Sequence, residues 1–112
     1  MTFTVQLSHH SLHVYRLALA LVRFVHRNPI GHRELRDQAQ RASVSVGLGI
    51  AEGAGLDGAA KRRHYSIARA SCLEVAAAYE LAEAIGEKVA CAQIQTQALP
   101  IIRILSRLTR PH

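Results

Sequence analysis

The stretch from Tyr65 to Ile85 constrains the fold most, because its apolar residues keep the period of an α-helix without a break. They recur every three or four positions, at Tyr65, Ala68, Cys72, Val75, Tyr79 and Ala82. This spacing places them on one face of a helix. We therefore predict a long helix over residues 58–85 that ends at Gly86 and buries this face, with Ile67, Leu81 and Ile85 broadening it.

Three further segments also follow a helical pattern, over about residues 9–27, 33–52 and 90–109. The apolar stripe of the first consists of Leu12, Tyr15, Leu19 and Val22, widened by Ala18 and Val25. The stripe of the last consists of Ile94, Ala98, Ile101, Leu105 and Leu108. Four helices with short connections favour an all-α, antiparallel up-down-up-down four-helix bundle, a single domain over residues 1–112.

Composition agrees with packed helices. The chain of 112 residues fits one domain with a single core. Only 4% of its residues are aromatic, and it has no tryptophan. Strands would favour more aromatic and β-branched residues, so the core is expected to consist of helices rich in alanine and leucine.

Local signals predict where the helices begin and end. Ser8 or Ser11 is a candidate N-cap for the first helix, and Asp57 for the third. Gly53 is the expected stop of the second. Because Pro100 falls inside the fourth pattern, we expect a kink there or a helix that begins just before it.

The second helix contains glycines where close contact with another helix is expected. Each of Gly47 and Gly49 costs about 1 kcal/mol relative to alanine in a helix interior, and something must offset this loss. We predict that small residues let a neighbouring helix approach: Ala42, Ser43, Ser45, Gly47 and Ala51.

The net charge of +6 favours an acidic partner, with nucleic acid first and an anionic membrane surface second. The candidate nucleic-acid-binding residues are Arg16, Arg23, Arg27, Lys61, Arg62, Arg63, Arg103, Arg107 and Arg110. The alternative is a solvated basic face without a partner. In the third helix the bases precede the acids, an order that opposes the helix dipole and is consistent with either a partner or salt bridges to neighbouring helices.

No catalytic residue, metal site or cofactor is predicted. His9 and His13 have the spacing of two zinc ligands, but a third and a fourth are not evident. The segments Gly47–Gly53 and Gly53–Gly58 lack the spacing or the residues of a dinucleotide or phosphate loop. We expect the serines of these helices to bond a carbonyl one turn back or a neighbouring helix.

Two acidic residues and two cysteines are given structural roles. Glu52 and Glu74 are expected to pair with Arg41 or Arg69, which would fix the register of the helices. Cys72 and Cys91 are expected to be unpaired buried thiols, which favours a reducing cytoplasm. No secretory signal or membrane span is expected.

Two segments carry a family resemblance. The run RASVSVGLGIAEG over residues 41–53, followed by ARASCLEV over 68–75, resembles the 23S rRNA intervening-sequence family of four-helix bundle proteins. That family has a motif like RAxxSIxxNIAEG and then a helix containing IAxGSxxEL. The matching residues are Arg41, Ala42, Ser45, Ile50, Ala51, Glu52, Gly53, Ala68, Ser71 and Glu74. Gly49 stands where the family has asparagine, and Leu56 lies near its usual arginine.

The resemblance implies a left-handed bundle that assembles into a ring, with pentamers among relatives. It also implies kinship with the accessory proteins of diversity-generating retroelements, which associate with nucleic acid and a reverse transcriptase. The hypothesis is a non-enzymatic homo-oligomer, a pentamer by resemblance, that binds RNA, DNA or a ribonucleoprotein through basic surfaces. The alternative is a protein-interaction scaffold without nucleic-acid binding, and a metal-dependent enzyme is the weakest possibility.

Overall fold

The protein is a four-helix bundle. The computed structural model describes residues 5–111, and in them it has four helices and no strand. The helices are α1 (His13–Arg27), α2 (Arg33–Ala54), α3 (Gly58–Ala84) and α4 (Cys91–Leu108). The predicted all-α class is thus confirmed.

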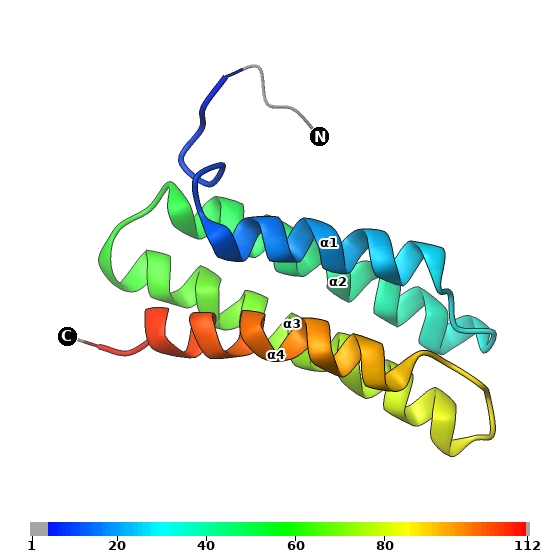
Figure 1. Ribbon diagram of the computed structural model, residues 1–112. Helices are drawn as coiled ribbons and strands as arrows, with labels where there is room; N and C mark the ends of the chain where they lie inside the picture. Colours follow the sequence, from blue (N-terminus) through cyan, green and yellow to red (C-terminus); the bar gives the residue numbers. More distant parts are fainter. Residues whose placement is uncertain (1–4, 112) are drawn as a thin grey trace.

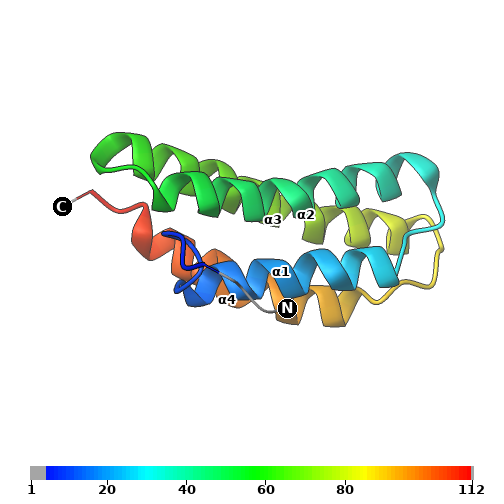
Figure 2. The ribbon, with the colours of Figure 1, turned by 90° about the horizontal axis from the view of Figure 1, so that it is seen from above.

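The helices form two layers, with α2 beside α3 in one and α1 beside α4 in the other (Figures 1 and 2). Each layer also contacts the other, α1 against α2 and α3 against α4. The α1–α2 and α3–α4 connections lie at one end of the bundle (Figure 1). The α2–α3 connection, the beginning of α1 and the end of α4 lie at the opposite end.

The predicted apolar stripe of α3 is buried along its whole length, from Tyr65 at 4% exposed to Ala82 at 0%. At the opposite end from the α2–α3 connection, the Tyr79 hydroxyl donates a hydrogen bond of 2.8 Å to the carbonyl oxygen of Asn28. This bond fastens the α1–α2 connection to α3. The helical period of α3 therefore predicted its main buried stripe correctly. The expectation that Ile67, Leu81 and Ile85 broaden the buried face is wrong, because all three are exposed.

In α1 the predicted apolar stripe is only partly confirmed as the buried face, because Ala18 and Val25 are buried but its four main residues are not. Leu12, Tyr15, Leu19 and Val22 are only half-buried. The buried residues of this helix are Val14, Ala18, Leu21 and Val25. Because α1 is apolar around much of its circumference, two adjacent stripes fit the helical period, and packing against α2 and α4 selects the second.

Glycine brings α2 and α3 together at two positions. A Cβ added at Gly49 would lie 3.0 Å from the Cβ of Ala68, and one at Gly53 would lie 2.6 Å from Cε1 of Tyr65. Between the same helices, the hydroxyls of Ser45 and Ser71 share a hydrogen bond of 2.9 Å. A Cβ at Gly47 would meet nothing within 4 Å, so the packing role predicted for Gly47 is wrong.

The helix N-caps differ from those predicted. Helix α1 begins at His13 after Leu12, with no side-chain cap, so neither Ser8 nor Ser11 caps it. The preceding residues form turns, in which the His10 amide donates to the carbonyl of Leu7 at 3.1 Å. Asp57 does precede α3, but its side chain makes no capping hydrogen bond.

Two positions expected to interrupt helices lie inside them. Gly53 does not stop α2, which continues to Ala54, with Gly55 as its C-cap. Pro100 lies in the interior of α4, which begins at Cys91, so the expectation of a helix that begins just before the proline is wrong. None of the helices in residues 5–111 has the length and hydropathy of a membrane span.

Candidate nucleic-acid interface

Most of the candidate nucleic-acid-binding residues lie at one end of the bundle. We call it the basic end, and it comprises the beginnings of α1 and α3 and the end of α4. It carries Arg16, Lys61, Arg62, Arg63, Arg103, Arg107 and Arg110. The acids near it are Glu52 and Asp57, whereas Glu34, Asp37, Glu80, Glu83 and Glu87 lie toward the other end. Arg23 and Arg27, in the second half of α1, are therefore separated from the rest of the predicted set.

The cations that α3 and α4 place at the basic end are not neutralised within the described chain. The ion pair in residues 5–111 joins Glu52 and His64, and none of these lysines and arginines pairs with a carboxylate there. Arg69, farther along α3, donates from Nε to the Ser106 hydroxyl at 2.7 Å instead of binding an acid. The lysines and arginines of α3 and α4 at the basic end therefore present positive charge that no carboxylate of the described chain neutralises.

Part of this charge surrounds a concave site, which we call the corner pocket. Its volume is about 350 Å³, and it is lined by Leu12, Gly58, Lys61, Arg62, Tyr65, Arg107 and Leu108. Lys61, Arg62 and Tyr65 come from the first two turns of α3, and Arg107 comes from the last turn of α4. The structure thus brings together three candidate residues that the sequence named separately.

Tyr65 is the residue of the corner pocket that sequence reasoning missed as a site residue. Its side chain is 4% exposed, and burial raises the pKa of its hydroxyl. The hydroxyl has no hydrogen-bond partner among residues 5–111. In the sequence Tyr65 belongs to the apolar stripe of α3, and nothing in that stripe distinguishes it from a core aromatic residue.

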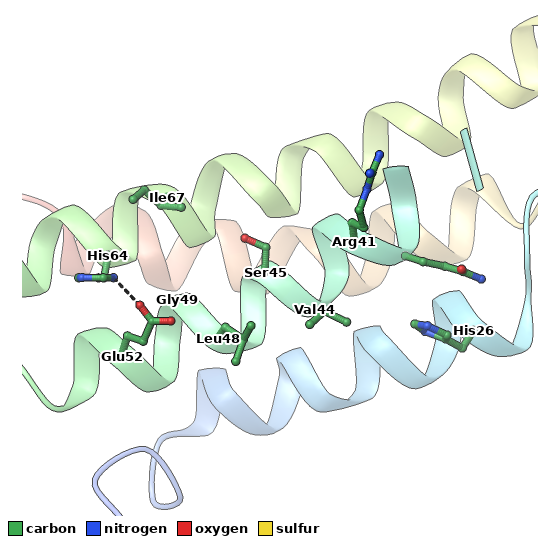
Figure 3. Close-up of a pocket in the computed structure, with 10 residues that line it drawn as sticks. His26, Arg41, Val44, Ser45, Leu48, Gly49, Glu52, His64 and Ile67 are labelled. Atoms are coloured by element: carbon green, nitrogen blue, oxygen red, sulfur yellow. Dashed lines mark ion pairs between the residues drawn. The ribbon is translucent and has the colours of Figure 1, made fainter. Parts of the chain in front are cut away.

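A second concave site, the outer groove, runs along α2, with further lining residues from α3 and from the end of α1, and has a volume of about 550 Å³ (Figure 3). Its apolar part consists of Val44, Leu48 and Ile67, which are 43%, 56% and 46% exposed. His26 and Arg41 lie toward one end of the groove, and Glu52 and His64 lie toward the other (Figure 3). The outer groove is therefore apolar along its middle and polar at both ends.

The ion pair at the end of the outer groove corrects a prediction. Oε2 of Glu52 lies 3.1 Å from Nδ1 of His64, which is the dashed contact in Figure 3. Glu52 and Glu74 form no ion pair with Arg41 or Arg69 in the described chain. One turn of α3 separates His64 from Ala68, the residue that packs on Gly49, so the close approach of the two helices brings His64 within reach of Glu52.

Val44 and Leu48 form a ridge, because a smaller groove of about 190 Å³ lies on their other side, against α1. Tyr15, Leu19 and Val22 line it. This explains why these three residues are only half-buried. The sequence did contain the signal for the ridge, since Val44 and Leu48 are four residues apart and lie off the buried stripe of α2.

The serines and cysteines considered in the sequence form hydrogen bonds within the bundle or are buried in it. Ser43 Oγ donates to the carbonyl of Gln40 at 2.9 Å, and Ser45 bonds Ser71, as expected for hydroxyls on helix faces. Cys72 and Cys91 are free and buried, which confirms the prediction. Burial raises the pKa of the Cys72 thiol to about 12, so this thiol stays protonated and unreactive at neutral pH.

The histidines at the beginning of α1 are not part of a ligand cluster. The ring of His9 packs edge-on against Tyr15, with centroids 4.5 Å apart. Burial and the neighbouring charge of His10 lower the pKa of His9. Over residues 5–111, no group of three or more histidine, cysteine, aspartate and glutamate side chains is placed to hold a metal ion.

A family model described as 23S rRNA-intervening sequence protein matches residues 10–107. The match covers nearly the whole of the four helices. The comparison with curated proteins found no match. The two motif segments named from the sequence lie on α2 and α3, where Gly49, Gly53 and the Ser45–Ser71 bond hold the helices together.

Proposed function

This chain belongs to the 23S rRNA-intervening sequence protein family, and from that premise we propose that it is a non-enzymatic, oligomeric protein that binds nucleic acid or a ribonucleoprotein. The observation that carries the proposal is the basic end, where lysines and arginines of α3 and α4 have no carboxylate partner in the described chain. Phosphates of a nucleic acid would neutralise this charge.

The chemistry of the basic end favours contacts with the phosphate backbone. Arginine and lysine bind phosphate oxygens whatever the base sequence, so affinity should depend steeply on salt and weakly on sequence. Lys61, Arg62 and Arg107 supply such donors from two helices. The proposal assigns no catalytic residue, metal or cofactor to this surface.

We also propose that copies of the chain, as up-down-up-down bundles, associate into a ring, with a pentamer as the expected size. The alternating ends of the helix connections support the antiparallel arrangement (Figure 1). The ridge of Val44 and Leu48, with Ile67 across the outer groove, is an exposed apolar surface of the kind that marks protein interfaces. Repeating the basic end around a ring would add avidity to weak binding by each subunit.

Fluorescence anisotropy with generic RNA and DNA at low and high salt tests the nucleic-acid proposal. We expect binding at low salt that weakens steeply as salt rises. The double variant Arg62→Gln/Arg107→Gln should bind more weakly, whereas Arg33→Gln, at the opposite end of the bundle, removes one charge and should change little. Absence of binding at low salt would overturn the proposal.

The scaffold alternative has its own support in the uneven distribution of charge. Glu80, Glu83 and Glu87 lie at the end opposite Arg103 and Arg107, so end-to-end contact between subunits would pair opposite charges. Charge reversal in Arg103→Glu/Arg107→Glu would then disrupt assembly, and the chain would bind no nucleic acid. Solution mass and anisotropy of the same variant distinguish the two functions.

The remaining partner assignments are proposals of the same kind. Kinship with accessory proteins of diversity-generating retroelements makes a reverse transcriptase a candidate partner. The position of the gene would distinguish a retroelement from a ribosomal setting. It would lie beside a reverse transcriptase gene with template repeats in the first, and inside a ribosomal RNA gene in the second. A cytoplasmic location is supported by the two buried free thiols.

A further inference from the structure

We infer that the corner pocket binds a phosphate group, held by Lys61 and Arg62 of α3 and Arg107 of α4, with the Tyr65 hydroxyl as a further donor. This inference rests on the proposed function, because it names where a nucleic-acid phosphate would sit. It adds a defined site to a surface that was otherwise only basic. The same chemistry would also fit the phosphate of a free nucleotide.

The first argument is the convergence of charge without a counter-ion. Lys61 and Arg62 are half-buried at the beginning of α3, and Arg107 reaches the same pocket from the last turn of α4. None of the three pairs with a carboxylate in residues 5–111. Like charges that converge on one pocket repel one another, and an anion in the pocket turns that repulsion into attraction.

The second argument concerns the N-terminus of α3. The side chain of Asp57 does not cap the helix, and Gly58, its first residue, lines the corner pocket. The first amide groups of a helix lack carbonyl partners within it, and the helix dipole favours an anion at this end. The basic residues alone oppose that dipole, whereas a bound phosphate satisfies both the dipole and the side chains.

The third argument is independent of charge and comes from Tyr65. Its hydroxyl has no hydrogen-bond partner in the described chain although the side chain is 4% exposed. The hydroxyl itself is not a fully buried atom, so it is an available donor in the pocket wall that a bound acceptor can use. Phosphate oxygens accept hydrogen bonds from all the polar side chains in this lining.

The size of the corner pocket limits the ligand. Its volume of about 350 Å³ is near the lower end of the range of ligand pockets. A phosphate group with the sugar attached to it fits such a space. We therefore place one phosphate of a longer chain in the pocket, with neighbouring phosphates contacting exposed cations such as Arg63 and Arg110.

The experiment uses pyrophosphate as the small probe and a labelled generic RNA as the large one. Calorimetry measures pyrophosphate binding, and anisotropy at low salt measures RNA binding and its competition by pyrophosphate. Arg107→Gln and Tyr65→Phe test the pocket, and the second variant keeps the ring that packs on Gly53. Arg33→Gln is the charge-matched control, and circular dichroism checks that each variant keeps its helices.

We expect pyrophosphate to bind and to compete with RNA. Arg107→Gln should weaken pyrophosphate binding about tenfold, because a charge-assisted hydrogen bond is lost. Tyr65→Phe should weaken it by about threefold, the effect of one neutral donor. Arg33→Gln should leave pyrophosphate binding within about twofold of the original chain, because its charge is screened at that distance.

The outcomes separate this inference from the proposed function. If RNA binds but pyrophosphate does not, or if Arg107→Gln and Tyr65→Phe bind pyrophosphate as the original chain does, the corner pocket is not a phosphate site and the inference is overturned. If RNA does not bind while pyrophosphate binding depends on Arg107 and Tyr65, the phosphate comes from a free nucleotide. The inference then stands and the nucleic-acid proposal fails.

Discussion

Gly53 of α2 lies directly against the ring of Tyr65 on α3, with the space for a Cβ occupied by the tyrosine at 2.6 Å. This contact lets the two helices approach at the end of the bundle where the corner pocket lies. It also fixes the ring of Tyr65, a residue of the pocket lining. A residue of the family-like motif on α2 thus positions a residue of the candidate site on α3.

Gly53→Ala tests this contact. The added methyl group collides with a buried ring, and overpacking of this kind destabilises a protein by about 1–3 kcal/mol. Urea denaturation followed by circular dichroism measures the free energy of unfolding. Gly47→Ala is the matched control, because a Cβ there meets nothing within 4 Å. It should stabilise the protein by about 0.5–1 kcal/mol through helix propensity, and equal effects of the two variants would contradict the packing argument.

The hydrogen bond between Ser45 and Ser71 predicts a coupling between α2 and α3. At 2.9 Å the two hydroxyls satisfy each other in a half-buried position. Ser45→Ala or Ser71→Ala alone should cost about 1 kcal/mol, because each leaves one hydroxyl unpartnered. In the double variant the second substitution should cost clearly less than the first. A double-mutant cycle of unfolding free energies measures this coupling, and strictly additive effects would show that the bond contributes nothing.

The helices could be predicted from the sequence because their apolar residues recur with the period of a helix. Which of two adjacent apolar faces of one helix is buried could not be predicted. The stripe from Tyr65 to Ala82 is buried throughout, whereas other apolar residues of α3, such as Ile67 and Leu73, stay exposed. In α1 the choice between the Leu19 stripe and the Leu21 stripe depends on contacts with α2 and α4, which no local pattern specifies. Gly53 was expected to end α2, because the sequence alone does not distinguish a glycine at a helix end from a glycine at a close contact between helices.

The candidate site was predictable only as a list of cations. Lys61, Arg62 and Arg107 were each named from charge, but their meeting depends on the register of α4 against α3. The partner of Glu52 was predicted wrongly for the same reason, since His64 reaches it only where glycine brings the helices together. Contacts across helices are decided by packing geometry.

Alkaline pH should destabilise the protein, most strongly through two buried groups whose pKa values are raised furthest. Burial raises the pKa of Cys72 from 9.0 to about 12 and that of Tyr79 from 10.0 to about 12. Both are neutral when protonated, so the unfolded chain loses its protons first as the pH rises. Their contribution is therefore fully present below about pH 9 and is lost between about pH 9 and 12, by at most about 1.4 kcal/mol per pH unit for each group.

Urea denaturation at intervals above neutral pH measures this loss. Cys72→Ala should reduce the part of the decline that begins near pH 9, leaving the parts due to Tyr79, Tyr65 and Cys91, whose pKa values are also raised. Ser43→Ala, at an equally buried but non-titrating side chain, should change the stability at every pH and leave the slope as it was. An unchanged slope in Cys72→Ala would contradict the assignment of the decline to this thiol.

The last prediction concerns the ridge on α2. Leu48 is 56% exposed and lines both the outer groove and the smaller groove beside α1. If subunits associate through this surface, Leu48→Asp places a charge in an apolar interface, and a buried unpaired charge is strongly unfavourable. We expect the solution mass, measured by light scattering, to fall from that of an oligomer to the 12.3 kDa of one chain.

Leu73→Asp is the matched control for the ridge. Leu73 is 44% exposed and lies on α3, outside both grooves that border the ridge. The same change from leucine to aspartate there should preserve the mass of the original assembly, while far-ultraviolet circular dichroism shows that both variants keep their helices. A monomer in Leu73→Asp together with an intact oligomer in Leu48→Asp would move the subunit contact from α2 to the outer side of α3. The ridge of Val44 and Leu48 would then not be the contact between subunits.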